Sequence, residues 1–408
     1  MDDHLRELAD LADTAGANVV GEMTQQIDRP HPGTYLGSGK LEELRARVAE
    51  LDASLVLFDE ELSPTQGKNI EDAIGKRVMD RAELILDIFA TRARSAEAKM
   101  QVELAQLEYM LPRLTRMWTH LEKFRGGIGM RGPGETQLET DRRLINHRIK
   151  ILRERLLDVQ RGRAIQRQSR QTEFKASLVG YTNAGKSSIL RSLTGVSTIF
   201  VENRLFATLD PLTRDVDLGD NAHVLVTDTV GFIRKLPHHL VASFRATLEE
   251  TRDADLLLHV IDASSPTWEE QRVVVSQVLD ELGVGGRPTL LVFNKIDLIA
   301  HDALLALQER MAALSPSSIF VSSVTEGGLE PLRRALASSI RRRRPVTRIL
   351  MSPADGRMLA EIHRDGEVLE QRMEGERLLV EARVDEILAG RLRRAGAEVS
   401  NGTAAHTS

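Results

Sequence analysis

The chain has 408 residues, contains no cysteine and carries a formal net charge of −5. A single hydrophobic core rarely serves more than about 300 residues, so this length predicts two to four domains. Without cysteine the chain can form no disulfide, no thiolate metal site and no cysteine nucleophile, and this composition fits a reducing cytosol. No apolar stretch is long enough to span a membrane, and the acidic N-terminus shows no signal-peptide pattern.

Residues 1–94 are predicted to form a small α/β domain. The apolar runs at 19–22 and 55–58 have the composition of strands, and residues 41–51 between them show helical spacing. A further helix, alone or after a strand, is expected at 81–89.

Two shorter signals lie within this first domain. Ser63 and Pro64, followed by Gln66, indicate a helix that begins with proline at its first position. The segment 35–40, Tyr-Leu-Gly-Ser-Gly-Lys, resembles half of a phosphate-binding loop. It lacks the leading glycine and the GK[ST] ending, so we interpret it as a plain loop rather than a nucleotide site.

Residues 95–173 carry a different pattern, in which apolar residues recur mainly in steps of four and three. They are Met100, Leu104, Leu107, Leu111, Leu114, Trp118 and Leu121, and then Leu138, Ile145, Ile149, Leu152, Leu156 and Val159. This spacing predicts the seam of two helices folded back on each other as an antiparallel coiled coil. Pro112 should kink or split the first helix.

Between these helices, residues 125–135 read RGGIGMRGPGE, with five glycines and one proline that rule out a helix. At 1.5 Å per residue, each helix can hold this loop roughly 40 Å from the body. The segment 91–170 has 18 Lys and Arg against 9 Asp and Glu. A solvated helical face accounts for part of that charge, but an arm with a basic tip favours contact with RNA.

From 174 to 345 apolar runs alternate with helical patterns, which is typical of a doubly wound, mostly parallel sheet. Buried strands are expected at 176–179, 223–227, 256–261, 289–293 and 318–321. The basic run 341–344 closes the domain, and we interpret it as a solvated helix end rather than a nucleic-acid site.

The first expected strand leads into Gly180–Ser187, which reads G-x-x-x-x-G-K-S, and a helical pattern follows. This strand–loop–helix context is what a phosphate-binding loop requires, because the backbone N–H groups of the loop then point at a polyphosphate. Lys186 would reach the β- and γ-phosphates, and the Ser187 hydroxyl would bind Mg²⁺.

Asp228 and Gly231 form D-x-x-G at the end of the next strong strand, 41 residues after Ser187. The carboxylate can hold Mg²⁺ through water, and the Gly231 N–H can sense a γ-phosphate. Between the two motifs, residues 204–214 include Thr208 and Thr213, and one of these threonines should close over Mg²⁺ in the triphosphate state.

The N-K-x-D segment, Asn294 to Asp297, follows the strand expected at 289–293 and indicates the base. The Asp297 carboxylate can accept from both N1–H and the exocyclic amine of guanine, whereas adenine offers neither donor there. Such a site can discriminate by roughly 10⁴ or more. Asn294 would support the loop, and Lys295 would lay its stem over the ring. Ser322, Ser323 and Val324 form a weaker fifth motif behind the base.

Residues 346–397 are predicted to form a small C-terminal α/β appendage. Strands are expected at 346–351 and 377–384, with a helix at 356–363. The tail 398–408 is small and polar, which predicts disorder.

The motifs GYTNAGKS, LFATLDP, DTVGFIR and NKID, with GPGETQLETDRR in the coiled-coil segment, resemble the HflX family of translation-associated GTPases over nearly the whole chain. The resemblance implies a central P-loop GTPase domain, binding to the 50S ribosomal subunit and its RNA with the glycine loop near the peptidyl-transferase centre, and splitting of stalled 70S ribosomes. It also implies a cytoplasmic protein, with a membrane-peripheral fraction, that is monomeric off the ribosome. It favours Thr208 over Thr213 as the magnesium-binding threonine.

Motifs and resemblance together place the binding of GTP, GDP and Mg²⁺ in five segments. They are Gly180, Tyr181, Thr182, Asn183, Ala184, Gly185, Lys186 and Ser187; Phe206, Ala207, Thr208, Leu209 and Asp210; Asp228, Thr229, Val230 and Gly231; Asn294, Lys295, Ile296 and Asp297; and Ser322, Ser323 and Val324. Ser187 and Thr208 are expected to bind the metal, and Lys186, Thr208 and Gly231 to act in catalysis.

Phe232 occupies the position after D-x-x-G at which Ras-like enzymes carry the glutamine that orients the attacking water. Phenylalanine can neither donate nor accept a hydrogen bond, so intrinsic hydrolysis should be slow. Two other functions remain open: a GTP-gated ribosome-assembly or RNA-binding factor in which hydrolysis is a timer, and an RNA-remodelling ATPase seated in residues 1–94, where no complete ATP motif is found.

Overall fold

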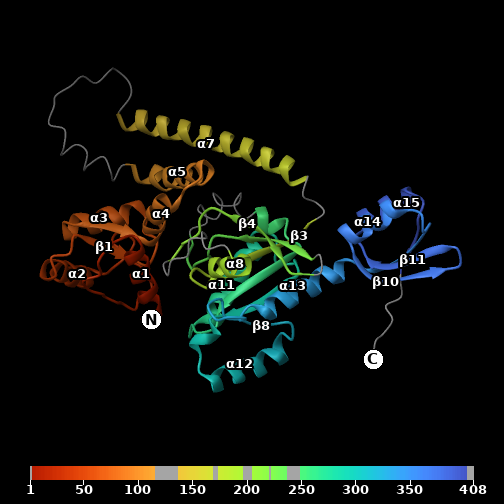
Figure 1. Cartoon of the computed structure of the whole chain (residues 1–408). Coiled ribbons are helices and arrows are strands. Elements are labelled where there is room, and N and C mark those ends of the chain that lie inside the picture. The colour runs from red at the N-terminus through yellow and green to blue at the C-terminus, as the bar shows by residue number, and fades with distance from the viewer. Residues whose placement is uncertain are drawn as a thin grey trace. The chain divides into compact units, whose positions relative to one another are not determined.

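The computed structural model describes residues 2–114, 137–168, 173–195, 205–219, 222–236 and 249–401. The chain, drawn in Figure 1, divides into two compact units. Unit 1 comprises Met1–Gln168, Val201–Pro211 and Thr229–Glu249, and unit 2 comprises Ser169–Phe200, Leu212–Asp228 and Glu250–Ser408. The range 174–345 expected for the central domain is therefore shared, because two of its loops belong to unit 1.

The body of unit 1 has two parallel strands and four helices. Its elements are α1 (Asp2–Thr14), α2 (Ser38–Glu50), β1 (Leu55–Phe58), α3 (Pro64–Ile74), β2 (Arg77–Asp80) and α4 (Arg81–Arg92). The helix start predicted at Ser63 is confirmed: its hydroxyl accepts from the Gln66 N–H, and the Gln66 side chain accepts from the Ser63 N–H. The core between α2, α3 and β2 includes Leu44, Ile70 and Val78.

The strand predicted at 19–22 is wrong, since these residues form no regular element. Val19 and Val20 are 42% and 49% exposed, so their β-branched side chains gain little from burial. A Cβ on Gly21 would meet the Leu51 side chain at 2.5 Å. The segment is therefore a loop that lies close to Leu51 at the C-terminal end of α2, and the glycine at position 21 makes this close contact possible.

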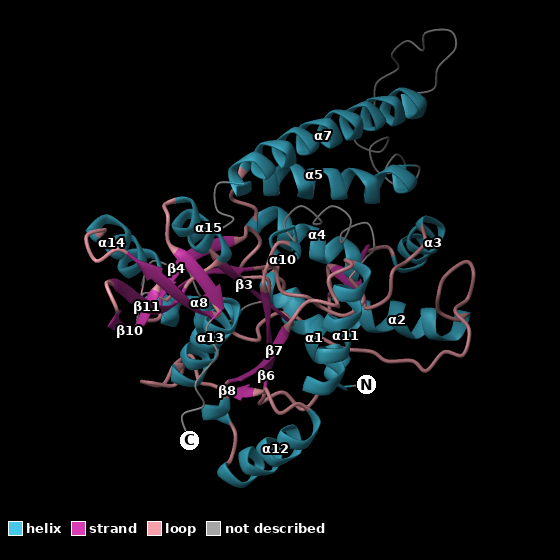
Figure 2. Cartoon of the chain, turned by 90° about the vertical axis from the view of Figure 1, so that its right-hand side faces the viewer, coloured by secondary structure: helices cyan, strands magenta, loops and turns pink. Residues whose placement is uncertain are grey.

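Two long helices of unit 1, α5 (Ala96–Met110) and α7 (Gln137–Gln168), lie side by side and run in opposite directions (Figures 1 and 2). Their contact uses the predicted seam, with Leu104, Ile149, Leu152 and Leu156 buried. Two cross-helix ion pairs flank it, Glu103 with Arg148 and Glu108 with Arg153, each at 2.7 Å. At Pro112 the α-helix has ended and a 3₁₀ turn, η1 (Leu111–Arg113), follows. The glycine loop 125–135 and the seam beyond Leu114 lie outside the described residues, so the full coiled-coil arm stays a prediction.

A buried polar cluster joins the end of α5 to the body of unit 1. The Asp80 carboxylate, 2% exposed, accepts hydrogen bonds from Leu62 N (3.0 Å), Glu83 N (2.9 Å) and the Tyr109 hydroxyl (2.9 Å). Arg113 donates to Leu62 O at 2.7 Å and to Asp80 at 3.4 Å. Burial, and then the charge of Asp80, raise the pKa of Tyr109, which keeps the phenol protonated as a donor.

Unit 2 is built on a six-stranded sheet in the order β4-β5-β3-β6-β7-β8, parallel except for the edge strand β4. The strands are β3 (Phe174–Gly180), β4 (Leu212–Asp217), β5 (His223–Asp228), β6 (Leu256–Asp262), β7 (Thr289–Asn294) and β8 (Ile319–Phe320). The helices are α8 (Lys186–Thr194), α10 (Glu249–Arg252), α11 (Trp268–Glu281), η2 (Ile296–Leu298), α12 (His301–Leu314) and α13 (Glu330–Arg343). All five predicted strands are confirmed. The missed strand, β4, has an exposed face that breaks its apolar pattern.

The C-terminal part of unit 2 is a four-stranded antiparallel sheet in the order β10-β11-β9-β12. Its elements are β9 (Val346–Met351), α14 (Gly356–Asp365), β10 (Glu367–Glu374), β11 (Arg377–Arg383), α15 (Glu386–Arg394) and β12 (Glu398–Asn401). The disorder predicted for 398–408 is wrong for 398–401, because these residues pair with β9 and Val399 packs against the local core. Residues 402–408 lie outside the described residues.

Candidate functional site

The loop between β3 and α8 has a backbone that only glycine can follow at two positions. Gly180 has φ 154°, and a Cβ there would meet the carbonyl oxygen of Val260 at 2.3 Å. Gly185 has φ 95°, and its Cβ would meet the Asn294 amide nitrogen at 2.2 Å. The strand–loop–helix expected from the sequence is present, and it brings backbone N–H groups to the N-terminus of α8.

Lys186 is buried, and its ammonium folds back over this loop. It donates to the carbonyl oxygens of Gly180 (3.1 Å) and Tyr181 (2.8 Å). Burial lowers the pKa of Lys186 to about 8, while the Asp228 carboxylate opposes that shift and the Lys295 charge adds to it. A polyphosphate would supply the anionic partner that a buried ammonium requires.

Ser187 and Asp228 place two oxygen ligands together at the carboxyl end of β5. The Ser187 hydroxyl donates to the Asp228 carboxylate at 2.6 Å, and Asp228 is 1% exposed. Hydroxyl and carboxylate oxygens are what Mg²⁺ prefers in phosphate sites, so these residues fit the ion expected from the sequence.

The base-reading segments are tied to the phosphate loop by Asn294, which is fully buried. Its side-chain amide donates to Ala184 O at 3.0 Å and accepts from Ser323 N at 3.2 Å. Ser322 donates to one oxygen of the Asp297 carboxylate at 2.6 Å. Three motifs that are far apart in the sequence thus form one connected site, in which Asp297 is held by a neighbour.

Asp262, at the end of β6, is a residue of this site that the motifs did not indicate. Its carboxylate lies 2.7 Å from the Lys295 ammonium. The signal that points to it is topological, since ligands of open parallel sheets bind at the carboxyl ends of the strands.

The segment 206–210, which is predicted to contact the nucleotide, belongs to unit 1. Phe206 packs edge-on against Phe89 at 4.7 Å, and Asp210 accepts from the backbone N–H groups of Arg94 and Ser95 at 3.1 Å each. Asp210 therefore caps the N-terminus of α5 together with Ser95, whose hydroxyl also donates to it.

Thr208 and Thr213, the two candidates for the metal, have different surroundings. Thr213 lies in β4, where its hydroxyl is 2.9 Å from that of Thr227, so it belongs to the sheet. Thr208 lies in a loop and is half-buried. This difference supports the choice of Thr208 that the family resemblance implies.

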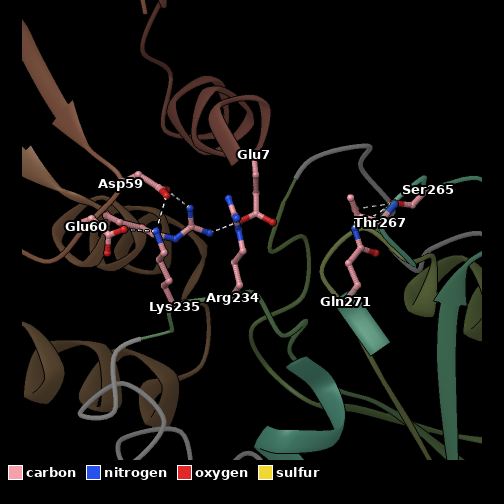
Figure 3. A network of polar contacts seen from close by, with 9 residues as sticks. Glu7, Asp59, Glu60, Arg234, Lys235, Ser265, Thr267 and Gln271 are labelled. Carbon is pink, nitrogen blue, oxygen red and sulfur yellow. Dashed lines mark hydrogen bonds and ion pairs between the residues drawn. The ribbon is translucent and has the colours of Figure 1, made fainter. Parts of the chain in front are cut away.

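The segment after D-x-x-G is held in unit 1 by a network of charges (Figure 3). Arg234 donates to Glu7 of α1 at 3.0 Å, and Lys235 contacts Asp59 at 2.7 Å and Glu60 at 2.6 Å. The buried Arg81 bridges Glu7 and Asp59. Phe232, just before these residues, is 2% exposed. No sequence motif indicates this pairing, because its members come from distant segments.

Gln271 orders the entry into α11 in unit 2. Its side-chain amide donates to the hydroxyls of Ser265 (3.1 Å) and Thr267 (3.3 Å) (Figure 3). These contacts fix the loop that follows Asp262.

Three family descriptions match consecutive parts of the chain. Residues 2–90 match "GTP-binding GTPase N-terminal", residues 92–170 match "GTP-binding GTPase Middle Region", and residues 175–295 match "50S ribosome-binding GTPase". In the described residues, no helix is long and apolar enough to cross a membrane.

Curated relatives match over most of their length. The protein "GTPase HflX" of Magnetococcus marinus is 46% identical over 403 residues, which covers 97% of this chain and 92% of the relative. "GTPase HflX" of Escherichia coli is 45% identical over 87% of this chain and 83% of its own length. Among solved structures, a GTP-binding protein from Sulfolobus solfataricus in complex with GDP is 28% identical, with a TM-score of 0.44, and the match covers 83% of this chain and 96% of that one.

Proposed function

The chain belongs to the HflX family of GTPases, and we propose that it hydrolyses GTP on the 50S ribosomal subunit and thereby splits or rescues stalled 70S ribosomes in the cytoplasm. The observation that carries this proposal is the near full-length match to HflX relatives, at 97% of this chain. The connected phosphate and base segments of unit 2 support the GTPase chemistry.

The contacts of Lys186 and Asp297 support the following roles for the site residues. Lys186 exchanges its two carbonyl partners for β- and γ-phosphate oxygens, and Asp297 accepts from the guanine edge with Ser322 holding its other oxygen. Ser187 and Thr208 would hold Mg²⁺, which when bound neutralises charge on the phosphates. Gly231 offers its N–H to the γ-phosphate.

Phe232 makes ribosome stimulation part of the proposal. The free enzyme lacks the usual means of orienting water, so its turnover is slow and the triphosphate state lasts until the target is found. A partner that orders the active site can contribute about 10²-fold or more, given the roughly 10³–10⁵ that arginine fingers supply. Steady-state GTP hydrolysis should be slow for the free protein, fast in the presence of 50S subunits and slow in the presence of 30S subunits. A free enzyme as fast as the 50S-bound one would contradict this gating.

Contact with ribosomal RNA is proposed for the α5–α7 pair and the glycine loop between them. Glu103 and Glu108 neutralise two arginines of α7, which stabilise the pair rather than face a ligand. Arg142, Lys150 and Arg155 of α7 are exposed, and such side chains can neutralise phosphates.

Sedimentation distinguishes this function from its alternative, a GTP-gated assembly or RNA-binding factor with hydrolysis as a timer. Purified 70S particles are mixed with the protein and GTP and separated on a sucrose gradient, with Lys186→Ala as the control that cannot use GTP. Free subunits in the wild-type sample alone support splitting. A 70S peak that keeps the protein bound supports the alternative.

A further inference from the structure

Lys295 has an unusual backbone conformation. Its φ is 64° and ψ 31°, in the left-handed region that non-glycine residues seldom occupy. Lys295 lies between β7 and the η2 turn, so this backbone conformation sets the direction in which its side chain leaves the edge of the sheet. Strained residues persist where the surrounding structure holds them, and they gather at ligand sites.

In the part of the chain that the structure describes, the side chain of Lys295 pairs with Asp262. The two charged groups are 2.7 Å apart, and the side chains are only 22% and 17% exposed. Asp262 and Asn294 are register partners on β6 and β7, so Asp262 lies beside the residue that precedes the lysine. The position of Asp262 is itself fixed, since its other oxygen accepts from Ser264 N at 3.0 Å and from the Ser264 hydroxyl at 2.6 Å.

We propose that Asp262 is a positioning residue for nucleotide binding, which fixes the Lys295 stem as a preformed platform for the purine ring. A lysine stem is apolar and flexible, and it offers a flat contact only when its ammonium is held at the far end. Holding it before the nucleotide arrives removes the cost of ordering it on binding. Asp297 then reads the edge of the base, and Asp262 determines how tightly any purine of that shape is held.

Loss of the Asp262 carboxylate and loss of the Asp297 carboxylate should therefore have different effects on the preference for guanine. Loss of the platform should weaken the binding of GDP and of inosine diphosphate by the same factor, because contact with the face of the ring does not involve the exocyclic amine. Loss of the Asp297 acceptor narrows the difference between these nucleotides, because only guanine has that amine.

The test measures dissociation constants of GDP and inosine diphosphate for the full chain by titration calorimetry. Asp262→Asn keeps an oxygen for Ser264 and removes the charge opposite Lys295. This variant should raise the dissociation constants of both nucleotides by about tenfold, which is equivalent to about 1.4 kcal/mol of binding free energy. The matched control Glu269→Gln neutralises another acidic side chain of unit 2, which pairs with Arg310 on the surface, and should change neither constant by more than about twofold.

A double-mutant cycle with Lys295→Met separates positioning from general loss of structure. Met keeps an apolar stem without the ammonium, so adding Asp262→Asn to it should have no further effect. The proposal is overturned if Asp262→Asn, with an unchanged melting temperature, binds GDP within twofold of wild type, or if its effect persists in full in the Lys295→Met background. If Asp262→Asn fails to fold, Asp262→Ser supports the same cycle, since its hydroxyl can serve the Ser264 N–H.

Discussion

The lowered pKa of Lys186 predicts that nucleotide binding depends on pH. The buried ammonium has a pKa of about 8 in the protein without nucleotide. Phosphate oxygens favour the charged form, so nucleotide raises this pKa and binding takes up a proton above pH 8. With one such group, the dissociation constant of GDP should rise by about tenfold between pH 7 and pH 9.

The sign follows from which form binds. Below pH 8 the Lys186 side chain is already charged, so the affinity for nucleotide is constant. Above pH 8 the side chain is mostly neutral, so nucleotide binding must be accompanied by uptake of a proton from the solution. Folding shows the related effect: the pKa of Lys186 in the folded protein lies below the ordinary lysine value of 10.5, so the nucleotide-free protein gains stability as pH rises between about 8 and 10.5.

Calorimetry in two buffers with different ionisation enthalpies measures both the constant and the proton uptake. Lys186→Gln serves as the control, because any pH dependence it retains comes from other groups. A wild-type constant that is flat from pH 7 to pH 9, or proton release on binding, would refute the reasoning from burial.

Three further predictions concern the base, the arm and the core. Asp297→Asn should lower the affinity for GTP and raise that for xanthosine triphosphate, whose C2 carbonyl can accept from an amide, and a competition titration that still prefers GTP would exclude Asp297 as the base reader. Reversing Arg125 and Arg131 to Glu, or deleting residues 126–134, should leave basal GTP binding intact but lower 50S binding and ribosome-stimulated hydrolysis; equal 50S binding by wild type and variant over a range of salt would make the loop structural only. His259 is 3% exposed, and burial, with the charges of Arg272 and Lys186, lowers its pKa to about 3. The folded state stays unprotonated there while the unfolded state binds a proton below pH 6.5, so stability should fall by about 1.4 kcal/mol per pH unit as pH drops from 6 to 4, and urea unfolding of His259→Leu should lack this component of the slope.

Sequence patterns predicted the fold best where local and tertiary signals agree. The strands β6 and β7 are continuous apolar runs that are buried in the centre of a parallel sheet, and both were predicted. The edge strand β4 was missed because Arg214 and Asp215 face solvent and interrupt its apolar pattern. The strand β12 was missed because its residues are small and polar, and its formation depends on the free edge of β9 rather than on its own composition.

The motifs predicted residues that the fold of unit 2 brings together, but not all of the residues that hold them. G-K-S, D-x-x-G and N-K-x-D each specify their chemistry within a few consecutive positions. Asp262, which pairs with Lys295, lies at the end of a different strand, and the Asp80 carboxylate accepts from Leu62 and Tyr109. No periodicity links such partners, because the fold alone brings them together.

Asp210 shows that a motif residue can also have a structural role. Motif and family resemblance together place it, within LFATLDP, among the expected nucleotide contacts. In unit 1 its carboxylate accepts from two backbone N–H groups and the Ser95 hydroxyl at the start of α5, which is where a helix favours negative charge. Helix capping accounts for an acidic residue at this position, and contact between Asp210 and the nucleotide stays a prediction.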